Sequence, residues 1–155
     1  MEEVLVKKGQ TVVSDKKGAR LRVPSLGSAL AVAASDPSAR VSGVAVCIIP
    51  KKMDKASEIP DVMEQLRKLF KDMITKGAQP QNMRLFLAGA AGFTEEPDDM
   101  ALGKRLYKTV MKTLKKNGLK VTADHVGGPL NRSVYLDVGG EGLTVTMLNE
   151  REVQL

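Results

Sequence analysis

The sequence contains one cysteine and one histidine among its 155 residues, Cys47 and His125. A single cysteine cannot form an internal disulfide, so a disulfide framework is excluded. One histidine adds little toward a metal site, and we expect no cofactor. A Ser-His-Asp arrangement would depend on His125 alone, and the sequence has no Gly-x-Ser-x-Gly turn.

Long apolar runs are also absent. The longest, Val41 to Pro50, contains a serine and a glycine and is far shorter than the ~20 residues of a membrane-spanning helix. The acidic N-terminus is followed by lysines, without the apolar segment of a secretory signal. We therefore expect a cytoplasmic protein that does not insert into a membrane. The length and ordinary composition predict one folded domain over residues 1–155.

Aromatic residues make up only 3% of a chain whose net charge is +6. Lysines recur every fourth residue from Lys104 to Lys116, and such a stripe could meet phosphates. It is more often a solvated helix face, and few aromatic side chains are present to stack on bases. A nucleic-acid-binding module is the lesser alternative, and we expect an acidic protein surface as the partner.

Hydrophobic periodicity predicts a mixed fold. Amphipathic spacing indicates two main helices, and short apolar or alternating runs indicate strands. The expected helices cover residues 61–74 and about 100–116, and the expected strands cover 43–49, 83–88, 119–125, 133–137 and 143–147. We expect an α/β (mixed α+β) fold, with a layered mixed β-sheet, two main helices and a C-terminal β-hairpin.

The reactive side chains offer little chemistry. Cys47 lies inside the apolar run Val44–Ile49, where a small buried thiol packs well and is inert. The cysteine and His125 are the only thiol and imidazole that could be paired. Glycine-rich segments follow two expected strands, at Gly89–Phe93 and at Gly127-Gly128. They predict turns or close backbone approach to a ligand, without a nucleotide-binding fingerprint.

Several segments together resemble the CheD family of chemoreceptor glutamine deamidases over nearly the whole chain. These segments are Ser25-Leu26-Gly27-Ser28-Ala29, Val44 to Pro50, Ala88-Gly89-Ala90-Ala91-Gly92-Phe93, Gly103-Lys104-Arg105, and Gly127-Gly128 with Arg132-Ser133-Val134. In that family the first motif is Gly-x-Gly-Ser-Cys and ends in the nucleophile. A histidine base lies four residues before a proline, and a supporting threonine lies six residues before the cysteine.

In this sequence those three positions hold Ala29, Val46 and Val23. Alanine and valine can neither attack an amide nor transfer a proton, so three replacements at one site predict a non-enzyme. Because successive side chains of a strand point to opposite faces, Cys47 should face away from this site.

The resemblance therefore implies a catalytically inactive CheD-like protein that acts by protein binding in chemotaxis signalling. The implied partners are the cytoplasmic region of a chemoreceptor or a CheC-type phosphatase. The alternative is an active deamidase or cysteine hydrolase that uses Cys47, His125 or Ser28. The residues expected to line the pocket or bind the partner are Gly27, Ser28, Gly89, Phe93, Gly127, Gly128 and Arg132.

Overall fold

The structure is a computed structural model that describes residues 2–92, 97 and 101–155. Its strands are β1 (Glu2–Leu5), β2 (Thr11–Ser14), β3 (Ala19–Val23), β4 (Leu30–Asp36), β5 (Val41–Cys47), β6 (Arg84–Gly89), β7 (Ala123–Val126), β8 (Ser133–Asp137), β9 (Thr144–Thr146) and β10 (Val153–Gln154). Its helices are α1 (Val62–Thr75), the short 3₁₀ helix η1 (Pro80–Asn82) and α2 (Leu102–Lys116).

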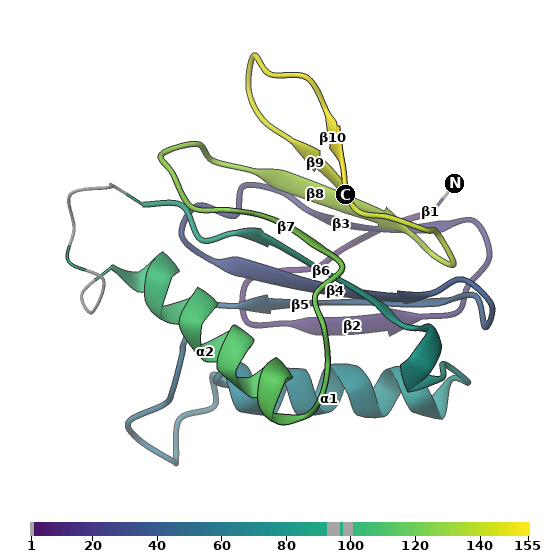
Figure 1. Cartoon of the computed structure of the whole chain (residues 1–155), viewed down its shortest axis with the longest axis horizontal. Coiled ribbons are helices and arrows are strands. Elements are labelled where there is room, and N and C mark those ends of the chain that lie inside the picture. Colours follow the sequence, from purple (N-terminus) through teal and green to yellow (C-terminus); the bar gives the residue numbers. More distant parts are fainter. Residues whose placement is uncertain (1, 93–96, 98–100) are drawn as a thin grey trace.

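The strands form two mixed sheets. We call the sheet with the order β2-β5-β4-β6-β7 the central sheet, and the sheet with the order β1-β3-β8-β9-β10 the outer sheet. Each contains one parallel pair, β6 with β7 and β1 with β3. In Figure 1, α1 and α2 lie against one face of the central sheet and the outer sheet lies on its other side. The molecule is therefore layered as helices, sheet and sheet.

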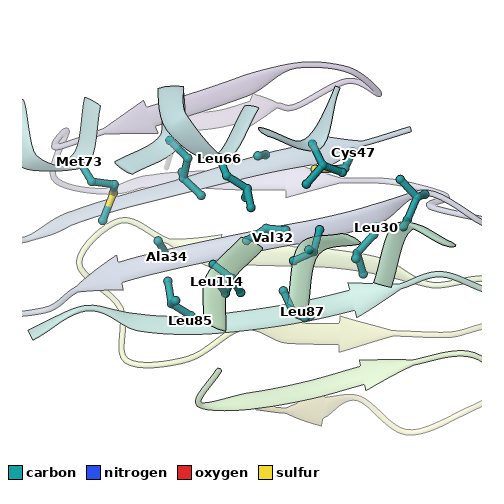
Figure 2. Close-up of a cluster of buried hydrophobic side chains, with 14 of the residues drawn as sticks. Leu30, Val32, Ala34, Cys47, Leu66, Met73, Leu85, Leu87 and Leu114 are labelled. Carbon is teal, nitrogen blue, oxygen red and sulfur yellow. The ribbon is translucent and has the colours of Figure 1, made fainter. Parts of the chain in front are cut away.

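Both faces of the central sheet are buried. Leu30, Val32 and Cys47 belong to an apolar cluster on the helix side, which Figure 2 shows packed with Leu66 and Leu114. Alternate residues of the same strands belong to a second cluster, between the two sheets. Every residue of β4 and β5 is buried as a result, since a strand covered on both faces has no solvent side.

The predicted fold class is confirmed, and so are both helices and the pairing of β8 with β9 as an antiparallel hairpin. Helix α1 begins after Asp61, whose side chain accepts a hydrogen bond from the Glu64 N–H at 3.1 Å, which satisfies a free donor of the first turn. The strands lie in two sheets instead of one, because β1 to β4 and β10 add to those that the sequence pattern indicated. No helix in the described part of the chain has both the length and the apolar character needed to cross a membrane.

Candidate functional site

Three loops meet at one end of the strands of the central sheet. Strands β6 and β7 run parallel and end there, at Gly89 and Val126. Strand β4 is antiparallel to β6 and begins there, where Leu30 pairs with Gly89. The residues before β4 and those after β6 and β7 are therefore brought together by topology.

A hollow of about 300 Å³ lies between these loops and the first turn of α2. Its lining residues are Ser28, Ala90, Ala91, Gly92, Ala101, Leu102, Gly103, Lys104, Gly127 and Gly128. Ser28 is the only hydroxyl-bearing residue among them, and Lys104 is the only charged one. This hollow is the candidate functional site.

Backbone hydrogen bonds hold the three loops to one another. Ala91 N–H donates to the Gly27 carbonyl at 3.0 Å, and Gly92 N–H donates to the Gly128 carbonyl at 2.9 Å. Ala90 N–H donates to the Ala29 carbonyl at 2.9 Å. The side chain of Asn131 accepts from Gly27 N–H at 2.7 Å. The walls of the hollow are thus fixed by the fold before any ligand arrives.

Two glycines permit close backbone approach at the site. A Cβ at Gly89, where φ is +114°, would collide with the Ala29 carbonyl oxygen. A Cβ at Gly103 would lie 2.5 Å from the Ala90 carbonyl oxygen, well inside ordinary contact distance. Glycine at position 103 therefore lets the first turn of α2 rest directly on the loop that follows β6.

Arg132 links the loops that follow β6 and β7. It is 5% exposed, and its guanidinium donates to the carbonyls of Gly89 at 3.1 Å and Gly127 at 2.6 Å. It also donates to Nδ1 of His125 at 2.7 Å. Burial lowers the pKa of Arg132 below its ordinary value. The side chain therefore anchors carbonyl groups of two site loops.

The first turn of α2 supplies hydrogen-bond donors to the hollow. Ala101 is the N-cap residue and has no side chain that could cap the helix. The first backbone bond into the helix is from Arg105 N–H to the Ala101 carbonyl at 3.0 Å. The N–H groups of Leu102 and Gly103 precede it and have no acceptor within the helix. The positive end of the helix dipole adds to their attraction for oxygen.

Ala29, Val46 and Val23 lie in the apolar cluster between the two sheets, exposed by no more than 3%. None of the three lines the hollow. The structure therefore places these three positions in one cluster, and Ser28, the residue before Ala29, lines the hollow.

Cys47 and His125 do not line the hollow. Cys47 is fully buried in the cluster on the helix side, the face of β5 opposite to Val46, and burial raises the pKa of its thiol to about 12. A thiol that stays protonated at neutral pH is a poor nucleophile. His125 is held through Nδ1 by Arg132. The described residues contain no group of side chains that could hold a metal ion.

Of the predicted site residues, Ser28, Gly127 and Gly128 line the hollow. Gly27, Gly89 and Arg132 form hydrogen bonds that hold its walls, and Phe93 lies outside the described residues. Sequence reasoning did not place the N-terminal turn of α2 at the site. The available signal was Gly103, a helix-weakening residue inside an otherwise strong helical pattern.

Residues 54–147 match the sequence profile of the family described as CheD chemotactic sensory transduction. The chain belongs to the CheD family. The matched range of this CheD-family chain begins after Ala29 and Val46.

The chain also aligns over longer ranges with individual CheD proteins. It is 29% identical to a probable chemoreceptor glutamine deamidase CheD 1 of Syntrophus aciditrophicus, with 89% of each chain covered. It is 30% identical to a probable chemoreceptor glutamine deamidase CheD of Thermococcus kodakarensis, over 88% of this chain and 87% of that one. It is 32% identical to the chemoreceptor glutamine deamidase CheD of Thermotoga maritima, over 73% and 72%.

Among solved structures, the hypothetical protein YfiH of Bacillus licheniformis is similar, with a TM-score of 0.50 and 14% identity. The match covers 76% of this CheD-family chain and 49% of that protein, about half of its length. At this identity the similarity concerns the fold alone.

The prediction that this CheD-family chain is not an enzyme is contradicted by its relatives, which are named as glutamine deamidases and align with most of its length. The prediction tied activity to three side-chain positions, Ala29, Val46 and Val23. The hollow next to them is built by other residues and contains the hydroxyl-bearing Ser28.

Proposed function

We propose that this chain is a cytoplasmic chemotaxis protein that deamidates glutamine side chains on the cytoplasmic region of a chemoreceptor. The observation that carries the proposal is the hollow beside Ser28, built from three loops and the first turn of α2. The names of the relatives support the substrate class.

The lining suits a primary amide. A glutamine side chain presents one carbonyl acceptor and two N–H donors. The N–H groups of the first turn of α2 suit the carbonyl oxygen, and the positive end of the helix favours the negative charge that develops on it during attack. The Ser28 hydroxyl can both donate and accept. Small residues, Ala90 to Gly92, leave room for the aliphatic part of the side chain.

Ser28 is the residue that we assign to attack on the amide. Its Oγ forms a bond to the amide carbon and gives up its proton, the C–N bond breaks, and the nitrogen leaves as ammonia with that proton. Water then hydrolyses the ester, which yields glutamate and restores Ser28. Cys47 is fully buried, and neither Cys47 nor His125 lines the hollow, so we assign the attack to Ser28.

The net charge of +6 supports an acidic protein surface as the partner, since opposite charge speeds and orients encounter. A chemoreceptor region is the partner that agrees with the names of the relatives. A CheC-type phosphatase stays a second predicted protein partner.

The proposal is tested by following ammonia release from a purified chemoreceptor cytoplasmic fragment, while binding of the fragment is measured separately by interferometry. We expect ammonia release with the native chain and none with Ser28→Ala, while Ser28→Ala retains binding. Cys47→Ala is the control and should leave the rate unchanged. Binding by the native chain without ammonia release contradicts deamidation, and Ser28→Ala with full activity contradicts the role of Ser28.

A further inference from the structure

Strand β2 leaves backbone groups unpaired at the edge of the central sheet. Among the strands of the described residues it pairs only with β5, and Val12 lies opposite Val44. Gly9 N–H donates to the Val46 carbonyl at 2.8 Å, and Val46 N–H donates to the Gln10 carbonyl at 2.9 Å. With Gly9 at a φ of +83°, this is a bulge with glycine at its first position.

The bulge decides which backbone groups of β2 face outward. In an antiparallel ladder, bonded and non-bonded pairs alternate. Counting from the bonded pair of Gln10 and Val46, the backbone groups of Thr11 and Val13 point away from β5. Within residues 2–92, 97 and 101–155, the outward backbone groups of Thr11 and Val13 have no backbone partner, so β2 can receive another strand at this edge.

A second hollow, of about 470 Å³, lies between the start of β2 and the first half of α1. It is lined by Gly9, Gln10, Thr11, Val12, Pro60, Glu64, Gln65 and Lys68. Helix α1 packs against β2, and Figure 1 shows the two elements side by side. An open edge strand beside a helix forms a groove in which an extended peptide can add a strand.

Gln65 links α1 to the start of β2 beneath this groove. The residue is 2% exposed, and its Nε2 donates to the carbonyls of Gln10 at 3.2 Å and Val46 at 3.1 Å. Its Oε1 is buried and has no hydrogen-bond partner among the described residues. The two carbonyls fix the orientation of the amide, so Gln65 holds α1 against the start of β2.

The charge around the groove favours an acidic occupant. Lys7 and Lys8 are exposed and adjoin Gln10, whose N–H donates to the Lys7 carbonyl at 2.9 Å. Both charged lining residues are paired, Glu64 with Lys52 at 2.7 Å and Lys68 with Asp72 at 2.8 Å, so Lys7 and Lys8 set the charge beside the groove. The net charge of +6 disfavours a second copy of this chain at the same edge.

We propose that the groove between β2 and α1 binds an extended acidic peptide segment of a partner protein, which adds a strand to β2 through the backbone groups of Thr11 and Val13. This site lies apart from the hollow beside Ser28, since the two share no lining residue. A partner bound here would leave that hollow accessible.

The test uses the full chain and a fluorescein-labelled peptide of sequence Asp-Glu-Val-Thr-Val-Glu-Asp, with binding followed by fluorescence anisotropy. Val13→Pro removes the outward N–H without removing a ladder bond to β5, and we expect about tenfold weaker binding. The matched control Val13→Ala keeps the N–H while it shortens the side chain, and we expect near-native binding. Circular dichroism confirms that both variants are folded.

Two further peptides test the backbone pairing and the charge preference separately. The same peptide with alternate backbone nitrogens methylated should lose binding, and one with lysines in place of its acids should bind at least about tenfold more weakly. Equal binding of the methylated peptide, or of Val13→Pro, overturns the proposal. No binding of the acidic peptide at millimolar concentration, or dimerisation of the chain through β2 in sedimentation, overturns it as well.

Discussion

Val46 and Cys47 are neighbours on β5, yet their side chains lie in different apolar clusters. Val46 packs between the two sheets, whereas Cys47 packs under the helices with Leu30 and Leu66 (Figure 2). The alternation of a strand explains the separation. The only thiol of the chain is therefore buried under the helices, on the face of β5 opposite to Val46, and it does not line the hollow.

Cys47 should make stability sensitive to alkaline pH. Burial raises the pKa of the thiol from 9.0 to about 12, so the folded state holds a proton that the unfolded chain releases. The contribution of the protonated thiol is fully present below pH 9.0 and is lost as the pH rises toward about 12. The urea midpoint of the native chain should fall more steeply across this window than that of Cys47→Ala. Parallel curves would contradict a buried, protonated thiol.

Arg132 should be a positioning residue of the site. Arg132→Met removes the donors to the Gly89 and Gly127 carbonyls, of which the Gly89 carbonyl keeps the Gly127 N–H at 3.0 Å, and we expect a cost of about 1–3 kcal/mol in unfolding free energy. Urea denaturation measures the loss. The KM for the receptor fragment should rise, because the loops that hold the amide move apart. Arg132→Lys, which restores one donor, should recover part of both effects, whereas equal behaviour of the two variants would contradict the anchoring role.

At the scale of elements, the position of α2 depends on one glycine. The first turn of the helix rests on the loop after β6 because Gly103 has no side chain between them. Intrinsic propensity alone would favour alanine at this position by about 1 kcal/mol. The close approach to the Ala90 carbonyl outweighs this preference, since a Cβ would lie only 2.5 Å from that oxygen.

Gly103→Ala should therefore destabilise the protein despite the better helix propensity. The added methyl group must push the first turn of α2 away from the loop and so distort the hollow. Gly92→Ala is a matched control, since it adds a Cβ at another residue of the same hollow where nothing lies within 4 Å. Thermal denaturation should show a lower Tm for Gly103→Ala than for Gly92→Ala. A Tm for Gly103→Ala at or above the native value would contradict the packing described here.

The predictability of the elements follows from their composition. Both helices were predictable because their apolar residues recur at helical spacing over about four turns. Strand β4 was missed because it is rich in alanine, a weak strand former, and it exists because both of its faces are covered. The candidate site was predictable only in part. Glycines marked its loops, but the approach of α2 to them is a tertiary contact that no local pattern contains.

At the scale of the whole molecule, the layers separate two surfaces. The loops at one end of the central-sheet strands form the hollow beside Ser28. The edge strand β2 of the same sheet forms the groove with α1. The hollow lies near β7, one edge strand of the central sheet, and the groove lies along β2, the other edge strand. A single chain can therefore hold a substrate side chain at one place and a partner segment at another.

The measurement that tests the central claim most directly is peptide mapping by mass spectrometry of a chemoreceptor cytoplasmic fragment after incubation with the native chain. The variant Ala29→Cys with Val46→His, which places a thiol and an imidazole where the sequence resemblance puts the family's nucleophile and base, serves as the comparison. Our account predicts glutamate in place of specific receptor glutamines with the native chain, and unchanged glutamines with Ser28→Ala. Receptor glutamines that remain intact with the native chain, while the double variant converts them, would contradict it.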